Sequence, residues 1–343
     1  MILPLWVLFG VRKVLGFSNG NPLIDKFHRF ESGVRRHCSE KMKESSETDI
    51  SWLICEDDNS TPYRLAYKHT LAAELSKNEE DNNNNDTTVI FCNGFQSVMT
   101  GGTKAIALEN HCLQNGWEFC SFDYRGHGLS SGVIFEECTL TDWIQDASNI
   151  LNRVLHKKKR VILVGSSMGA WISIHLASLR YNNNNVVGIL GIASGPDFFQ
   201  DLYFSSTVDQ RREWKDNGVV NFPSRYSDDP YPISWKLIED AAQHWGILPS
   251  TKPIPTTTAP PPLFVHCPVR LLHGKCDEDI PWEKSEELSK LLGSKKASEG
   301  KNNDVVLTLI EDGDHRLSRP QDIELILETL DTMVAELHGD QKQ

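Results

Sequence analysis

Short, continuously apolar runs alternate along the chain with longer stretches in which apolar residues recur at every third or fourth position. The runs are rich in β-branched residues, as is typical of strands covered on both faces, and they span Thr88–Cys92, Trp117–Tyr124, Arg160–Gly165, Val186–Ala193, Val269–His273 and Val305–Ile310. The stretches between them predict helices over residues 102–115, 142–155, 168–181, 282–292 and 321–338. This alternation predicts a mainly parallel sheet with helices on both faces.

Three segments depart from this rhythm. Ile50–Cys55 and Tyr63–Tyr67 precede it and predict short strands of an opening hairpin or meander. Residues 196–248 interrupt it with a long segment that is rich in aromatic and charged side chains. Because long irregular segments in compact domains usually have a function, we predict a lid at about residues 196–248, within one domain of residues 50–343. The alternative is a helical decoration that adds only stability.

The pentapeptide Gly165-Ser166-Ser167-Met168-Gly169 lies between a predicted strand and a predicted helix. In that context a Gly-x-Ser-x-Gly motif holds its central serine in a strained turn with the hydroxyl exposed. Glycine at both ends removes Cβ atoms that so tight a turn would bring into collision. The helix that follows directs a positive dipole end toward the serine. Ser167 is therefore the predicted nucleophile, and Ser166 is its neighbour.

A serine hydroxyl is a weak nucleophile and needs a base, which this motif typically finds in the order serine, acid, histidine along the chain. Asp277 follows the strand that starts at Val269, and it is the predicted acid. Asp279 is the alternative, although its place two residues before Pro281 better suits a cap of the next helix. His315 follows the last predicted strand and is the predicted base.

An oxyanion hole requires backbone N–H groups that point at the developing negative charge. We expect one donor at Met168, directly after the predicted nucleophile. We expect the second at Phe95, in the loop after the strand Thr88–Cys92, because Gly94 allows the chain to bend there. Residues 123–132 (Asp-Tyr-Arg-Gly-His-Gly-Leu-Ser-Ser-Gly) form a third landmark, for which we predict a structural role.

Composition restricts the possible partners and cofactors. The 35 basic and 47 acidic residues give a formal net charge of −12, and an acidic surface repels phosphate, which argues against nucleic acid as a partner. The eight cysteines lack the close, repeated spacing of a zinc site, so we expect reduced thiols. The predicted serine chemistry requires no metal and no organic cofactor.

The first 49 residues form a predicted N-terminal extension. Met1–Val11 is almost wholly apolar, but it is far shorter than the ~20 residues of a membrane helix, so we expect no integral membrane span. Arg12 and Lys13 precede the first acidic residue, Asp25. That distribution is compatible with an organelle-targeting segment, and a loosely docked terminus is the alternative.

Taken in order, five motifs resemble the α/β-hydrolase superfamily over about residues 50–337: Asn-Gly-Phe, Asp-Tyr-Arg-Gly-His-Gly-x-Ser, Gly-x-Ser-x-Gly, His-Gly-x-x-Asp-x-x-Ile-Pro and Gly-Asp-His. The resemblance implies the α/β-hydrolase fold. More narrowly, Gly94–Ala105 and Pro223–Ser227 resemble the group of alpha/beta-hydrolase domain-containing protein ten. Val98 and an apparent one-residue insertion at Gly101-Gly102 depart from the pattern of that group.

That group is described as mitochondrial thioesterases that remove palmitoyl groups from protein cysteines, and hydrolysis of acyl glucuronides is also attributed to it. The resemblance gives Ser167, Asp277 and His315 the roles of a catalytic triad. It implies an acylated protein or a small acyl compound as substrate and a mitochondrial location, with the cytoplasm as the alternative. The residues alone leave open a carboxylesterase or lipid-ester hydrolase, and a non-catalytic binding protein of the same fold.

Overall fold

The computed structural model describes residues 49–57, 61–71, 86–158, 160–178, 185–225, 228–244, 248, 265–294 and 304–339. The predicted N-terminal extension lies outside these ranges, apart from Asp49. Within them, no helix is both long and apolar enough to cross a membrane. The cysteines of the same ranges are free thiols.

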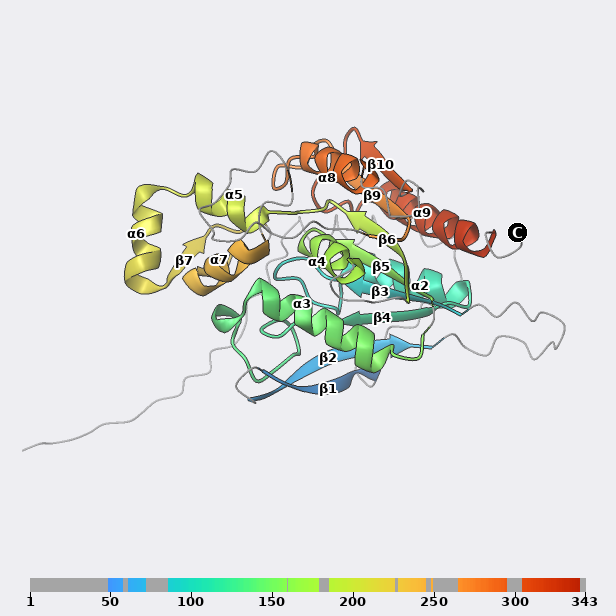
Figure 1. Ribbon diagram of the computed structural model, residues 1–343, viewed down its shortest axis with the longest axis horizontal. Coiled ribbons are helices and arrows are strands. Elements are labelled where there is room, and N and C mark those ends of the chain that lie inside the picture. The colour runs from blue at the N-terminus through green and yellow to red at the C-terminus, as the bar shows by residue number, and fades with distance from the viewer. Residues whose placement is uncertain are drawn as a thin grey trace, which may run out of the picture. The chain divides into compact units, whose positions relative to one another are not determined.

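Eight strands form one sheet in the order β1-β2-β4-β3-β5-β6-β9-β10 (Figure 1). They are β1 Ser51–Glu56, β2 Pro62–Thr70, β3 Thr87–Cys92, β4 Glu118–Phe122, β5 Arg160–Ser166, β6 Val186–Ile192, β9 Val269–Gly274 and β10 Val305–Ile310. Strand β2 pairs antiparallel with both β1 and β4, and the other pairs of this sheet are parallel. The predicted opening hairpin and mainly parallel sheet are confirmed.

Helices cover both faces of this sheet, as predicted. They are α2 Thr103–Gln114, α3 Leu140–Asn149, α4 Met168–Ala177, α8 Glu283–Ser294 and α9 Pro320–Gly339. Side chains alternate between the two layers along the central strands. In β3, Val89 and Phe91 join a core with α2 and α9, whereas Ile90 and Cys92 join a core with α3 and α4. Burial on both faces explains why these strands are continuously apolar.

Helix α3 begins at Leu140, two residues before the predicted start, because its cap lies upstream of the apolar pattern. The Thr139 side chain accepts a hydrogen bond from the Asp142 N–H, and the Asp142 carboxylate accepts one from the Thr139 N–H. This reciprocal capping box satisfies two N–H groups that a helix start otherwise leaves without partners. At its other end the helix continues as a π-helical turn, Ile150–Val154.

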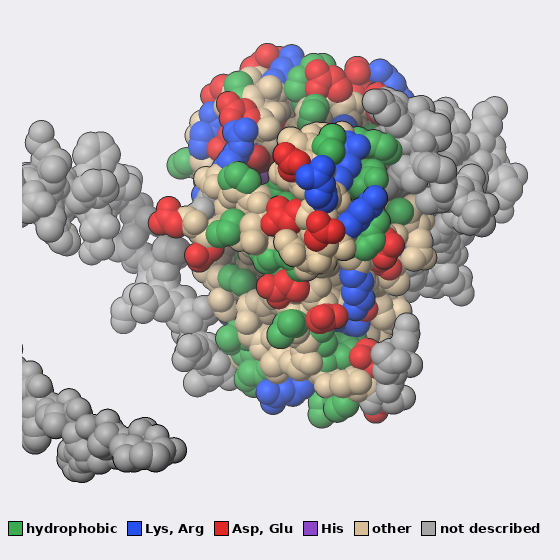
Figure 2. All heavy atoms as spheres, turned by 90° about the vertical axis from the view of Figure 1, so that its left-hand side faces the viewer, with side chains coloured by type: hydrophobic (Ala, Val, Ile, Leu, Met, Phe, Trp, Pro, Cys, Tyr) green, Lys and Arg blue, Asp and Glu red, His purple; other side chains and the backbone are tan. Residues whose placement is uncertain are grey.

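The insertion, which we define as residues 198–244, follows β6 and lies at the left of Figure 1. It comprises α5 Phe198–Ser205, α6 Val208–Asn217, β7 Val219–Phe222, β8 Tyr231–Ser234, α7 Trp235–Ala241 and the 3-10 turn η5 Ala242–His244. Within the insertion, buried Trp214 of α6 donates its indole N–H to the carbonyl of Ile233 in β8, at 2.8 Å, and so links these two elements. Figure 2 views this side of the molecule and shows acidic and basic side chains interspersed on it.

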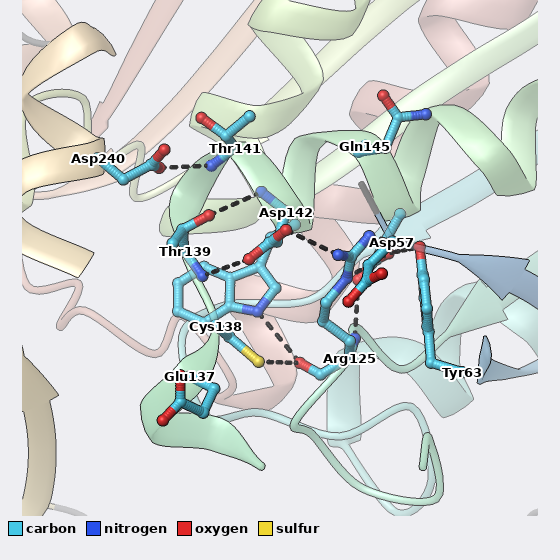
Figure 3. Close-up of polar contacts among 12 residues, drawn as sticks. Asp57, Tyr63, Arg125, Glu137, Cys138, Thr139, Thr141, Asp142, Gln145 and Asp240 are labelled. Carbon is cyan, nitrogen blue, oxygen red and sulfur yellow. Dashed lines mark hydrogen bonds and ion pairs between the residues drawn. The ribbon is translucent and has the colours of Figure 1, made fainter. Parts of the chain in front are cut away.

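Arg125, in the loop after β4, is the centre of a buried ionic network (Figure 3). Its guanidinium donates to Asp146 Oδ1 at 2.6 and 2.9 Å, to Asp142 Oδ1 at 2.7 Å, and to the Tyr63 hydroxyl. Burial opposes the positive charge, but the hydrogen bonds and charges of the two aspartates hold the pKa of Arg125 above its usual range. The network joins β2, α3 and the loop after β4.

Replacing Arg125 with alanine should destabilise the protein by about 3 to 5 kcal/mol, because it leaves the fully buried Asp146 carboxylate without its counter-charge. Chemical denaturation measures the change in the free energy of unfolding. Arg212→Ala is a matched control, since Arg212 pairs with Asp209 on the surface with 67% of its side chain exposed, and we expect a change below about 0.5 kcal/mol. Equal effects of the two substitutions would contradict this role of Arg125.

Candidate active site

Ser167 occupies the turn between strand β5 and helix α4, in the predicted strand–turn–helix context. Strand β5 ends at Ser166 and helix α4 begins at Met168, which leaves one residue for the change of direction. Ser167 takes φ 54° and ψ −115°, a backbone conformation that L-residues rarely adopt. A serine held in this way stores strain, as residues at functional sites often do.

The two glycines of the motif allow this turn through close packing rather than through unusual torsions. A Cβ atom on Gly165 would overlap the backbone of Gly169. A Cβ atom on Gly169 would overlap the carbonyl oxygen of Cys92, at the end of β3. The first contact closes the turn itself, and the second brings the start of α4 against the neighbouring strand.

The structure brings Ser167, Asp277 and His315 together, although they lie far apart in the sequence. His315 Nε2 lies 3.1 Å from Ser167 Oγ, and His315 Nδ1 lies 2.7 Å from Asp277 Oδ2. A carboxylate can only accept hydrogen bonds, so Nδ1 carries the proton and Nε2 is left to accept one from the serine hydroxyl. This arrangement can pass a proton from Ser167 to His315.

Asp277 is held by more contacts than its bond to His315. Its Oδ1 accepts the N–H groups of Asp279 and Ile280 at 2.9 and 2.8 Å, and its Oδ2 also lies 2.9 Å from His273 Nε2. Burial raises the pKa of this carboxyl group, but hydrogen bonds from His273 and His315 outweigh burial and keep the pKa well below its usual range. The carboxylate is therefore ionised at neutral pH.

Asp277, which accepts the hydrogen bond from His315 Nδ1, is favoured as the acid over Asp279, the alternative. The carboxylate of Asp279 lies 3.4 Å from the Arg225 guanidinium, which also contacts Glu278. Glu278 and Asp279 belong to the loop after β9, whereas Arg225 belongs to the insertion.

His273 is a contact of the acid for which the sequence analysis gave no role. It is fully buried at the end of β9, with Nδ1 at 2.7 Å from Ser285 Oγ and Nε2 at 2.9 Å from Asp277 Oδ2. The signal was its spacing of four residues from the acid within the His-Gly-x-x-Asp motif. A second missed residue is Lys104, whose Nζ donates to the carbonyl of Arg316, beside His315. Burial and the charge of Arg316 lower the pKa of Lys104 to about 8.

The predicted oxyanion loop, residues 93–97, lies beside Ser167, but its bend is not where we expected. Gln96 has the positive φ, 54°, whereas Gly94 does not. Gly94 instead allows close approach, because a Cβ atom there would lie 3.3 Å from the Ser166 carbonyl oxygen. The N–H groups of Phe95 and Met168 make no hydrogen bond to the described residues, so both remain available as donors.

A cavity of about 660 Å³ opens onto Ser167, His315 and the loop that contains Phe95. The insertion contributes a largely apolar part of its wall, composed of Phe198, Phe199, Leu202, Phe222, Tyr231 and Ile233. Lys104, Arg225, Asp229 and Arg316 add charged groups to the lining. The cavity therefore combines an apolar wall with a polar region.

Within the part of the chain that the structure describes, one group of side chains has the spacing of metal ligands. It consists of Asp277, Asp279 and His315, whose candidate ligand atoms lie within 4.8 Å of one another. Two of these residues already share the hydrogen bond that links the acid to the histidine. An ion bound there would compete with that bond, so the arrangement fits proton transfer better than metal coordination.

Comparisons with known proteins identify the family to which this chain belongs. The family model of the serine aminopeptidase S33 hydrolases matches residues 83–224. Mouse palmitoyl-protein thioesterase ABHD10, mitochondrial, is 36% identical over 250 residues, which cover 73% of this chain and 75% of that protein. Two solved structures are similar over most of the chain. A putative hydrolase from Agrobacterium vitis S4 has a TM-score of 0.68 and 31% identity, and the match covers 83% of this chain and 99% of that protein. Mouse alpha/beta hydrolase domain-containing protein 10 has a TM-score of 0.64 and 30% identity, and the match covers 84% of this chain and 99% of that protein. The predicted α/β-hydrolase fold is confirmed, and the chain belongs to the ABHD10 family of α/β-hydrolases.

Proposed function

We propose that this chain hydrolyses long-chain acyl thioesters, such as palmitoyl groups on protein cysteines, through an acyl-enzyme on Ser167. Membership of a serine hydrolase family is established, and the substrate and the roles of the residues are our inference. The observation that carries the proposal is the continuous hydrogen-bonded path from Ser167 through His315 to Asp277. The mouse and human relatives carry the name palmitoyl-protein thioesterase, which supports the choice of substrate class.

In the first half of the proposed reaction, Ser167 Oγ attacks the acyl carbonyl carbon while His315 Nε2 accepts the hydroxyl proton. Asp277 fixes the histidine tautomer and stabilises the imidazolium that forms. The N–H groups of Phe95 and Met168 donate to the oxyanion, and each such donor typically lowers the barrier by about 3 kcal/mol. The tetrahedral intermediate then collapses, the thiol leaves with the proton of His315, and the acyl group remains on Ser167.

In the second half, water replaces the thiol. His315 Nε2 removes a proton from the water as it attacks the acyl-enzyme, and the same donors hold the second oxyanion. Collapse returns the proton from His315 to Ser167 Oγ and releases the fatty acid. Every proton moves between the leaving thiol, water, Ser167 and His315, so the cycle needs no metal or organic cofactor.

The wall of the cavity supports an acyl substrate with a long chain. Its aromatic and aliphatic side chains would remove methylene groups from water, and each buried methylene stabilises binding by about 0.8 kcal/mol. The insertion, residues 198–244, supplies a large part of this apolar wall. We therefore propose that the insertion serves as the lid expected at about residues 196–248 and that it contacts the acyl chain.

We also propose a mitochondrial location, with targeting by the N-terminal extension of residues 1–49. The relatives named above are mitochondrial by name, and the extension has basic residues ahead of its first acidic one. Residues 1–49 fused to a fluorescent protein should direct it to mitochondria, as scored by imaging against a mitochondrial dye. The control is the same fusion with Arg12 and Lys13 of the extension replaced by glutamate, which should reach mitochondria less efficiently. A diffuse cytoplasmic signal from the unaltered fusion would contradict the proposal.

Replacing Ser167 with alanine should abolish labelling by a fluorophosphonate probe and reduce turnover by about 10⁴-fold or more, because it removes the nucleophile. Gel fluorescence and a thioesterase assay measure the two effects. Ser166→Ala is the matched control, since it removes a hydroxyl from the adjacent residue, and labelling should persist. Equal labelling of both variants would overturn the choice of Ser167, and absence of labelling in the unaltered protein would favour a non-catalytic binding protein.

A pair of matched substrates tests the preference for thioesters. A peptide that carries S-palmitoyl-cysteine should be cleaved with a kcat/KM about tenfold or more above that of the same peptide with O-palmitoyl-serine, because a thiolate leaves far more readily than an alkoxide. Mass spectrometry of the released peptide follows both reactions, with Ser167→Ala as the blank. Faster cleavage of the oxygen ester would instead identify a carboxylesterase.

A further inference from the structure

We propose that His127 is a positioning residue for the oxyanion loop, which it holds by accepting the backbone N–H of Gln96. The inference rests on the proposed function, because it assumes that this loop supplies the Phe95 donor. His127 belongs to the loop after β4, in the motif from which the sequence analysis expected only structure. The ring nitrogens of His127 bind Gln96 and Arg125 and lie outside the proposed triad.

The hydrogen bonds of His127 define its tautomer. Nδ1 lies 3.2 Å from the carbonyl oxygen of Arg125, and Nε2 lies 3.2 Å from the backbone nitrogen of Gln96. A carbonyl oxygen can only accept, so Nδ1 must carry a hydrogen, and Nε2 must offer a lone pair to the Gln96 N–H. The ring must be neutral to do both. Burial lowers the pKa of His127 to about 4, against the opposing effect of the Arg125 carbonyl, so the neutral form prevails at physiological pH.

The turn that His127 contacts needs support from outside. The Ser97 N–H donates to the Gly94 carbonyl oxygen at 3.1 Å, which closes a four-residue turn with Phe95 and Gln96 at its centre. Gln96, the third residue, has φ 54°, and turns of this kind favour glycine or asparagine at that position. A glutamine there is strained, so the turn persists only if surrounding contacts hold it. The bond from Gln96 to His127 is such a contact.

Fixing the Gln96 N–H also fixes the peptide group that joins Phe95 to Gln96. Rotation about the backbone of Phe95 would move that peptide and break the bond to His127. The N–H of Phe95 therefore keeps one direction relative to Ser167, as an oxyanion donor must, since misplacement by about 1 Å can cost 10²-fold in rate.

His127 is itself held in place by aromatic packing and hydrogen bonds. His127 is 4% exposed, and its ring packs edge-to-face against Phe135 and Trp143. The Arg125 carbonyl that receives its Nδ1–H also accepts the indole N–H of Trp143 at 3.1 Å. The Arg125 side chain is anchored to buried Asp146, so the path from the ionic network to the oxyanion loop passes through His127.

Three variants separate positioning from packing. His127→Leu keeps an apolar side chain of similar size but has no acceptor, whereas His127→Gln places an amide oxygen near the position of Nε2. His156→Leu is the matched control, because His156 also binds a backbone carbonyl through Nδ1, that of Arg153 at 3.1 Å, but is exposed and outside the oxyanion loop. A p-nitrophenyl acyl ester is the substrate, since it reports acyl transfer whether thioesters or oxygen esters are preferred.

We expect His127→Leu to lower kcat by about ten- to a hundredfold with KM within about twofold, because the oxyanion forms only in the transition state. His127→Gln should recover kcat to within about threefold of the unaltered protein, and His156→Leu should leave kcat and KM unchanged. In parallel, amide hydrogen exchange at Gln96 should be about tenfold or more faster in His127→Leu than in the unaltered protein.

Unchanged kcat and unchanged Gln96 exchange in His127→Leu would overturn the proposal. Equal losses in the leucine and glutamine variants would also overturn it and would identify the ring as a packing element. If the unaltered protein neither cleaved the ester nor bound the fluorophosphonate, the proposed function would fail. The exchange rate of Gln96 would still decide whether His127 holds the loop, so the two failures are distinguishable.

Discussion

Helix α4 lies so close to the end of strand β3 that a side-chain carbon on Gly169 would overlap the carbonyl oxygen of Cys92. This approach sets the distance between Ser167, which precedes the helix, and the oxyanion loop, which follows the strand. A larger residue at Gly169 would push the two apart and separate the nucleophile from one of its proposed oxyanion donors. Gly169 therefore contributes to the site by the absence of a side chain, which allows helix α4 to approach strand β3 closely.

Parallel strands explain why residues so distant in sequence meet at this point. Strands β3, β5, β9 and β10 all end at the same edge of the sheet, and the loops that follow them carry Phe95, Ser167, Asp277 and His315 respectively. Strands β3, β5 and β9 are buried along nearly their whole length, so packing on two sides fixes their ends, whereas β10 is a partly exposed edge strand. The site thus depends on the rigid sheet for its coarse geometry and on hydrogen bonds between loops for its fine geometry.

The sequence predicted the parts of the site that local pattern determines. The pentapeptide around Ser167 and the order of acid and histidine along the chain are such patterns. The sequence pattern predicted a bend at Gly94, but the bend lies at Gln96, where the backbone N–H donates a hydrogen bond to His127, 31 residues away. The contact of His273 with Asp277 was missed although the two residues lie only four apart, because that spacing does not show how the loop after β9 folds back over the strand end. Packing between distant segments decides such details.

Arg225 joins the insertion to the loop that contains Asp277, by ion pairs with Glu278 and Asp279. The side chains of Arg225 and Glu278 are 57% and 75% exposed, and pairs at such positions contribute at most about 1 kcal/mol. Asp277 itself is held by buried hydrogen bonds that do not involve Arg225. The ion pairs of Arg225 between the insertion and the loop are therefore weak, whereas the hydrogen bonds that hold the Asp277 carboxylate are strong. Dissolved salt should therefore weaken the ion pairs of Arg225, while the buried hydrogen bonds of Asp277 keep the carboxylate in place.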